Sequence, residues 1–240
     1  MSKRLKIIIA AVVVVAAVVG GGLYWFFKDD APAPVSLEAA AESVTETTSA
    51  TTTGTGIDGT WTVDTTSGDF DYESATGTFA GFRVQEELAA IGSTTAVGRT
   101  GDVSGTMTIA GTSVTDASFE IDITSITTNE SRRDDNVQSA LETDQYPTAT
   151  FTLTEPIELG AGADSGSTVS VVATGDLTIH GVTKSVAFPL EAKLVNGTVV
   201  VVGSLDITFS DFDVETPTSA AVLSVEDHGE LELQLLLQNG

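Results

Sequence analysis

Residues 169–209, VSVVATGDLTIHGVTKSVAFPLEAKLVNGTVVVVGSLDITF, decide the fold of this chain. Every second residue in each of three runs is apolar or glycine, which is typical of β-strands that turn one face toward a core. Asn196 and Gly197 separate the last two runs, and both tolerate the positive φ of a two-residue hairpin turn. The stretch therefore predicts consecutive antiparallel strands.

The same alternation continues on both sides of this stretch. Phe119, Ile121 and Ile123 alternate with polar residues, and so do Ala149, Phe151 and Leu153. Leucine occupies every second position from 231 to 237, so the chain from Trp61 onward predicts about eight strands. Such strands either close into a barrel or stack as a sandwich, and alternation alone does not choose. The length favours a barrel, whereas Pro189 in mid-strand predicts a bulge or an opening. Residues 129–141 are predicted to form a short helix over one end.

Residues 1–28 have the composition of a membrane anchor. Residues 7–27 carry no charge, and as a helix they span about 30 Å, the thickness of the hydrocarbon core of a bilayer. Three cations precede this run and aromatic residues end it, so we expect one transmembrane helix in the cell membrane, with a cytoplasmic N-terminus. The alternative is a signal peptide cleaved after Ala33, which would give a secreted domain, but Pro34 disfavours that cut.

Residues 29–56 are predicted to be a disordered linker. This segment consists mainly of Ala, Thr, Ser, Glu and Pro, and such a composition buries too little apolar surface to offset the entropy of ordering. The predicted organisation is therefore an anchor over 1–28, a tether over 29–56 and one extracytoplasmic β-domain over 57–240.

Charge and cysteine content exclude several classes of function. The chain has 10 Lys and Arg against 34 Asp and Glu, and all the acidic residues lie at or after Asp29. Such a negative field repels nucleic acid, so a nucleic-acid partner is not expected. The absence of cysteine excludes disulfides, thiol nucleophiles and Cys-ligated zinc.

Four short motifs resemble one protein family. In chain order they are Trp61-Thr62-Val63-Asp64, Arg132-Arg133-Asp134, Tyr146-Pro147-Thr148-Ala149-Thr150-Phe151 and Gly175-Asp176-Leu177-Thr178-Ile179-His180-Gly181-Val182-Thr183-Lys184. Their order and approximate spacing are similar to those of the YceI-like, polyisoprenoid-binding proteins. The resemblance covers essentially the whole β-domain. It implies an eight-stranded antiparallel, lipocalin-like barrel with one or two short helices.

The resemblance also implies a function, namely holding an isoprenoid lipid such as a polyprenyl lipid or a quinone in the apolar lumen. A barrel of this strand number either fills its lumen with side chains or leaves a small ligand cavity. The alternative is therefore a surface-displayed structural or interaction domain with a filled core and no ligand. A lipid carrier requires an enclosed apolar cavity, and that feature separates the two hypotheses.

The candidate ligand contacts are apolar residues of the inner face and three polar residues near strand or helix ends. The apolar set is Phe82, Phe119, Phe151, Leu177, Ile179 and Phe188, and the polar set is His180, Arg132 and Arg133. The two arginines suit a phosphate headgroup, but in so acidic a domain pairing with Glu130, Asp134 or Asp135 is the favoured alternative. His180 is either a headgroup contact or a turn residue that precedes Gly181.

No catalytic or metal-binding motif is present in the sequence. The two histidines are far apart, and the chain lacks a calcium loop, a nucleophile elbow and a dinucleotide fingerprint. We therefore expect a binding protein that is not an enzyme and that uses neither a metal nor a cofactor.

Overall fold

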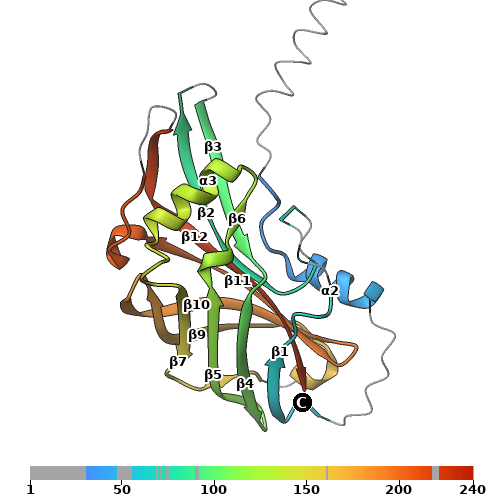
Figure 1. Ribbon diagram of the computed structural model, residues 1–240. Helices are drawn as coiled ribbons and strands as arrows, with labels where there is room; N and C mark the ends of the chain where they lie inside the picture. The colour runs from blue at the N-terminus through green and yellow to red at the C-terminus, as the bar shows by residue number, and fades with distance from the viewer. Residues whose placement is uncertain are drawn as a thin grey trace, which may run out of the picture. The chain divides into compact units, whose positions relative to one another are not determined.

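The computed structural model in Figure 1 describes residues 31–47, 56–68, 70, 72–73, 76–89, 92–160, 162–217 and 222–239. Within these ranges the chain forms the helices α2 (Leu37–Thr47) and α3 (Ser131–Ala140) and the short 3-10 helices η1 (Ile123–Ser125), η2 (Ala163–Ser165) and η3 (Phe209–Phe212). The strands are β1 (Gly59–Val63), β2 (Phe79–Leu88), β3 (Gly92–Thr100), β4 (Val103–Ala110), β5 (Ser113–Asp122), β6 (Thr127–Thr128), β7 (Thr148–Leu153), β8 (Ile157–Glu158), β9 (Val169–Ile179), β10 (Val182–Val195), β11 (Thr198–Thr208) and β12 (Val222–Asn239).

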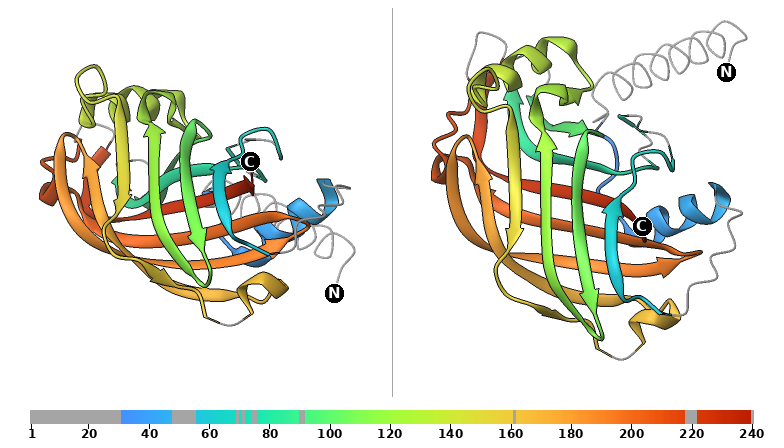
Figure 2. Two further views of the ribbon diagram at one scale, coloured as in Figure 1. Left: turned by 90° about the horizontal axis from the view of Figure 1, so that it is seen from below. Right: turned by 60° about the horizontal axis from the view of Figure 1, so that its bottom comes forward.

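The sheet closes into a barrel because the long strand β12 pairs along both of its edges. One edge pairs with β11 throughout β11, and the other pairs with β1 near the end of β12 and with β2 before that. β1 and β2 therefore occupy successive halves of one barrel position, and β3 with β4 and β5 with β6 do the same. Counted in this way, the described strands form an eight-stranded antiparallel barrel, visible in Figure 2, and this prediction is confirmed.

The two local predictions within residues 169–209 are also confirmed. Val195 pairs with Thr198 across a two-residue turn, in which Asn196 and Gly197 have φ angles of 50° and 85°. At Pro189 the barrel wall opens, because β10 pairs with β9 from Val182 to Ala192 but its ladder with β11 begins only at Leu190.

Alternation along β12 separates the inside of the barrel from its outside. The inward residues of this strand, among them Leu235 and Leu237, belong to a large apolar cluster with Trp61 of β1 and Val199 and Val201 of β11. Leu236 points outward instead, into a separate cluster. β12 therefore carries apolar side chains on both of its faces, because successive residues of a strand point to opposite sides.

The outward cluster is covered by residues 31–47, here called the N-terminal strap. Leu37, Ala40 and Val44 of α2 pack against Val200, Val202 and Leu236 on the outer face of the barrel, where Figure 1 shows the helix beside β11 and β12. The prediction of a disordered linker over 29–56 is therefore wrong for the strap. The apolar residues of the strap are spaced so that they lie on one face of the helix, and that face packs against the outer surface of the barrel.

The predicted anchor, residues 1–28, lies outside the described residues. In the part of the chain that is described, neither helix is long and apolar enough to cross a membrane.

Candidate binding cavity

The barrel lumen contains a cavity of about 570 Å³. This volume lies within the roughly 300–1,000 Å³ range of small-molecule sites. The cavity exists because several inward positions carry alanine where a larger residue would fill the lumen, and these positions are Ala80, Ala96, Ala117, Ala149 and Ala173. The hypothesis of a filled core therefore does not describe this barrel.

Phenylalanine rings form much of the cavity wall. Phe151 and Phe188 stand edge to face with their ring centroids 6.4 Å apart, a geometry that the ring quadrupoles favour. The Phe151 ring lies against Gly175 of the neighbouring strand, where a Cβ atom would come within 2.4 Å of it. Glycine at this position lets the ring lie along the wall, so that space remains in the lumen.

Helix α3 lies across one end of the barrel, as Figure 2 shows, and its residues form part of the cavity wall there. Val137, Ala140 and Leu141 contribute apolar lining from the helix and its C-terminal end. Arg133 pairs with the carboxylate of Glu86, which points inward from β2 and is buried. The helix is therefore both an apolar wall and a point of ionic contact with the barrel rim.

A family model described as YceI-like domain matches residues 37–237. This chain belongs to the YceI-like family. The resemblance of the four sequence motifs is thereby confirmed, and the match includes α2 as well as the barrel.

Two curated relatives each match part of this chain. Protein YceI of Escherichia coli is 46% identical over 77 residues, which is 31% of this chain and 35% of that protein. UPF0312 protein VPA0850 of Vibrio parahaemolyticus is 30% identical over 120 residues, which is 46% of this chain and 59% of that protein. The chain therefore matches less than two thirds of the length of either relative.

Two solved structures share the fold of this chain. A polyisoprenoid binding domain from Saccharophagus degradans aligns with a TM-score of 0.53 and 19% identity, over 68% of this chain and 94% of that domain. BcnA of Burkholderia cenocepacia aligns with a TM-score of 0.51 and 22% identity, over 66% of this chain and 94% of BcnA. At these identities the alignments establish the fold alone.

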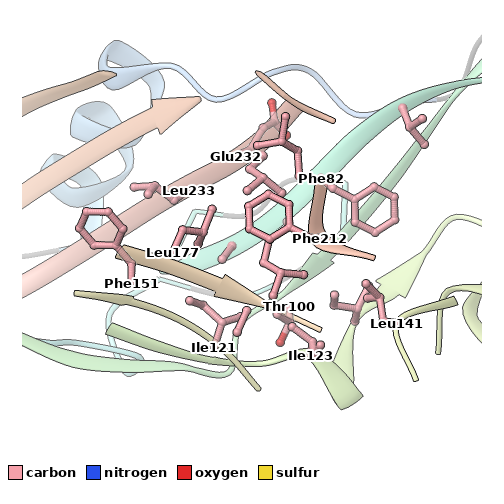
Figure 3. Close-up of a pocket in the computed structure, with 18 of the residues that line it drawn as sticks. Phe82, Thr100, Ile121, Ile123, Leu141, Phe151, Leu177, Phe212, Glu232 and Leu233 are labelled. Atoms are coloured by element: carbon pink, nitrogen blue, oxygen red, sulfur yellow. The ribbon is translucent and has the colours of Figure 1, made fainter. Parts of the chain in front are cut away.

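The structure places most of the predicted contacts of this YceI-like domain on the cavity wall. Seven of them line the cavity, namely Phe82, Phe119, Phe151, Leu177, Ile179, Phe188 and Arg133. Figure 3 shows Phe82, Phe151 and Leu177 around a common space, together with Phe212 of η3. The side chain of Arg132 lies outside the described residues.

His180 does not line the cavity. It occupies the β9–β10 turn with a φ of 52°, its ring packs edge-on against Tyr146 at 4.7 Å, and its Nδ1 lies 3.3 Å from the backbone oxygen of Phe212. Its Nε2 lies 3.5 Å from Glu142, just beyond the end of α3. These contacts fit the interpretation of His180 as a turn residue that holds the segments at this end of the barrel together.

Sequence reasoning missed part of the cavity wall and the mouth of the cavity. The mouth is the end beside α3 that Glu130, Asn136, Glu215 and Thr216 line. Val84 and Leu88 share the inward face of β2 with Phe82, so the alternation already contained that signal. Glu130, Asn136 and Glu215 also line the cavity. They come from helix α3, its N-cap and the segment after η3, and no periodic pattern joins those segments.

A buried ionic cluster lies in the wall behind the cavity. The carboxylate of Glu232, which is 2% exposed, is 2.7 Å from Arg83 Nε and 3.3 Å from Arg99 Nη2. Burial lowers the pKa of Arg99, and the neighbouring Glu232 opposes this effect. The two guanidinium groups neutralise the only carboxylate in this part of the described wall, so the cavity beside it stays apolar in character.

Proposed function

We propose that this chain holds an isoprenoid lipid, of the polyprenyl or quinone kind, in the barrel cavity. The observation that carries the proposal is the apolar cavity of about 570 Å³, which aliphatic and phenylalanine side chains line over most of its surface. Burial of each CH₂ group contributes about 0.8 kcal/mol, so a long hydrocarbon chain binds firmly here with few polar contacts.

The comparisons support a lipid of this class. The chain is a YceI-like domain, and the aligned domain from Saccharophagus degradans is described as polyisoprenoid binding. Branched isoprenoid chains suit a lumen in which alanine positions alternate with phenylalanine rings, because methyl branches fit above the small residues.

We further propose that residues 1–28 anchor the domain to the cell membrane, with the barrel on the extracytoplasmic side. The uncharged run 7–27, the cations before it and the aromatic residues at its end support this assignment. A tethered carrier of this kind sequesters or presents its lipid at one membrane surface.

Lipid extraction from the purified domain tests the proposed function. The unit Ala31–Gly240, which is compact and includes the strap, is exported to the bacterial periplasm behind a cleavable signal sequence and purified without detergent. Native mass spectrometry then measures the bound mass, and solvent extraction with tandem mass spectrometry identifies the molecule.

One isoprenoid bound per chain supports the proposal and names the ligand. A mass equal to that of the polypeptide alone, unchanged after incubation with ubiquinone and undecaprenol, contradicts it. That second result favours an interaction domain that uses its surface rather than its lumen.

A further inference from the structure

The ionisable side chains that line the described cavity are mostly acidic. They are Glu86, Glu130, Glu215 and Glu232, with Arg133 as the one basic member. Arg83 and Arg99 neutralise Glu232 from within the wall. Glu86 and Arg133 neutralise each other. Glu130 and Glu215, both exposed at the mouth, remain, and no ion pair joins either of them to a described side chain.

The surrounding sequence strengthens this negative field. From Leu194 to Gly240 the chain contains no Lys or Arg. Asp211, Asp213 and Glu215 occupy alternate positions in the segment that borders the mouth. A mouth of one charge sign focuses its field on any group that enters it, and low-dielectric walls enhance the effect.

Arg133 is not free to bind an anion. Its guanidinium group donates to Glu86 and to the side chain of Asn129. Moving it to a phosphate would leave the Glu86 carboxylate, 6% exposed, without its cationic partner. An uncompensated buried charge is strongly unfavourable. The cation that the sequence suggested for a phosphate is therefore already engaged.

We infer that the mouth selects isoprenoid lipids with an uncharged headgroup, such as an alcohol or a quinone, and rejects the phosphate of the same chain. This inference rests on the proposed function and adds the headgroup class. Asn136 and Thr216 line the same mouth, and their amide and hydroxyl groups donate hydrogen bonds to a neutral oxygen. Glu130 and Glu215 repel a phosphate at that place.

The test compares two probes that share one hydrocarbon chain, farnesol and farnesyl phosphate. Titration calorimetry measures their binding to the full chain in phosphatidylcholine nanodiscs, and the signal of empty discs is subtracted. We expect farnesol to bind about tenfold more tightly than farnesyl phosphate at low salt, with the ratio shrinking at high salt because exposed charges are screened.

Matched charge variants identify the groups responsible. Glu130→Gln combined with Glu215→Gln should reduce the farnesol preference severalfold. Glu120→Gln combined with Glu191→Gln removes the same charge from exposed strand positions that do not line the cavity and should leave the ratio as it was. Arg132→Gln removes the neighbouring cation and should raise the farnesol preference or leave it unchanged.

Three outcomes overturn the inference. Farnesyl phosphate that binds as tightly as farnesol, or more tightly, shows that the mouth does not reject anions, and loss of that binding in Arg132→Gln or Arg133→Gln identifies the cation that accepts them. A ratio that the mouth variants do not change shows that other groups set the preference. Failure of both probes to bind contradicts the proposed function itself.

Discussion

The carboxylate of Glu232 accepts a hydrogen bond from Arg83 Nε at 2.7 Å, within the barrel wall behind the cavity. The same carboxylate accepts the backbone N–H of Val35 at 3.1 Å, and Arg83 also donates to the backbone oxygen of Pro32. Arg99 donates to the oxygen of Ala33 at 2.8 Å. The buried ionic cluster thus binds the backbone of the N-terminal strap to strands β2, β3 and β12.

Replacing Glu232 with glutamine should destabilise the domain. The variant leaves two buried guanidinium groups without an anion, and breaking a buried pair in this way costs about 3–5 kcal/mol. Urea denaturation of the unit Ala31–Gly240 at neutral pH measures the loss. Glu120→Gln, at an exposed position of β5, is the matched control, and equal stability of the two variants would show that the cluster contributes little.

Filling the cavity should remove the lipid and leave the fold intact. Ala149 lines the cavity from β7 and is only partly buried, so Ala149→Phe places a ring in open space. We expect the amount of co-purified lipid to fall to less than about half, because the ring takes volume that the chain needs. Thr152→Phe adds the same ring to an exposed position of the same strand, and a similar loss of lipid in that control would count against the cavity as the site.

The strands were predictable because they follow a period of two, whereas the barrel was favoured by the chain length and implied by the family resemblance. The strap was missed because Leu37, Ala40 and Val44 form a helical face with few large residues. That face is stabilised only by the outer surface of the barrel, which the sequence pattern does not place beside it. The barrel surface on which α2 packs did leave a signal in the sequence. Residues 199–202 are all valine, so both faces of β11 are apolar, and an apolar outer face requires a cover.

The candidate site was predictable on the strands and not at the mouth. Phe119, Phe151 and Leu177 line the cavity as the alternation indicates. Glu86 occupies an inward position of β2, which the alternation of Phe82 and Val84 implies but which an acidic side chain argues against. Its partner Arg133 arrives from α3, and the placement of a helix over a barrel end is a tertiary contact that periodicity does not encode.

Weakening the apolar face of α2 should release the strap. Leu37→Ala combined with Val44→Ala removes buried apolar atoms that pack on Val200 and Leu236. We expect a loss of about 2–4 kcal/mol in the free energy of unfolding, together with faster hydrogen exchange in β11. Glu38→Ala combined with Glu42→Ala changes the exposed face of the same helix and serves as the control. Equal exchange in both variants would mean that the strap does not depend on this face.

The free energy of unfolding should fall in acid because the Asp64 carboxylate becomes protonated. Burial raises the pKa of this carboxyl, but hydrogen bonds from Ser67 and Thr66 outweigh it and hold the pKa below its ordinary value. A depressed pKa in the folded state stabilises the fold above the unfolded pKa of about 3.9, and this contribution disappears as the pH falls through the folded pKa.

Urea denaturation at several pH values between neutral and strongly acidic checks the role of Asp64. Asp64→Asn should be less stable than the parent at neutral pH, and the difference should shrink below about pH 4. Asp116→Asn, at an exposed position of β5, is the control. A difference that stays constant with pH would assign the effect to lost packing instead of lost charge.

The ion pair between Arg133 and Glu86 should control how fast lipid leaves the cavity. This pair joins α3 to β2 across the mouth, so breaking it lowers the barrier to moving the helix aside. We expect Arg133→Gln to release a fluorescent farnesol analogue about tenfold faster, since a charge-assisted hydrogen bond contributes about 1.5–3 kcal/mol. Stopped-flow transfer of the analogue to acceptor vesicles measures the rate.

The exchanged pair Glu86→Arg with Arg133→Glu tests whether the ionic contact itself is responsible. It restores opposite charges across the same mouth, so release should slow toward the parent rate relative to Arg133→Gln. Lys184→Gln removes an exposed cation from β10 and should leave the rate unchanged. If Arg133→Gln and Lys184→Gln release the analogue equally fast, lipid leaves by a route that does not require α3 to separate from β2, and the opening beside Pro189 becomes the place to test next.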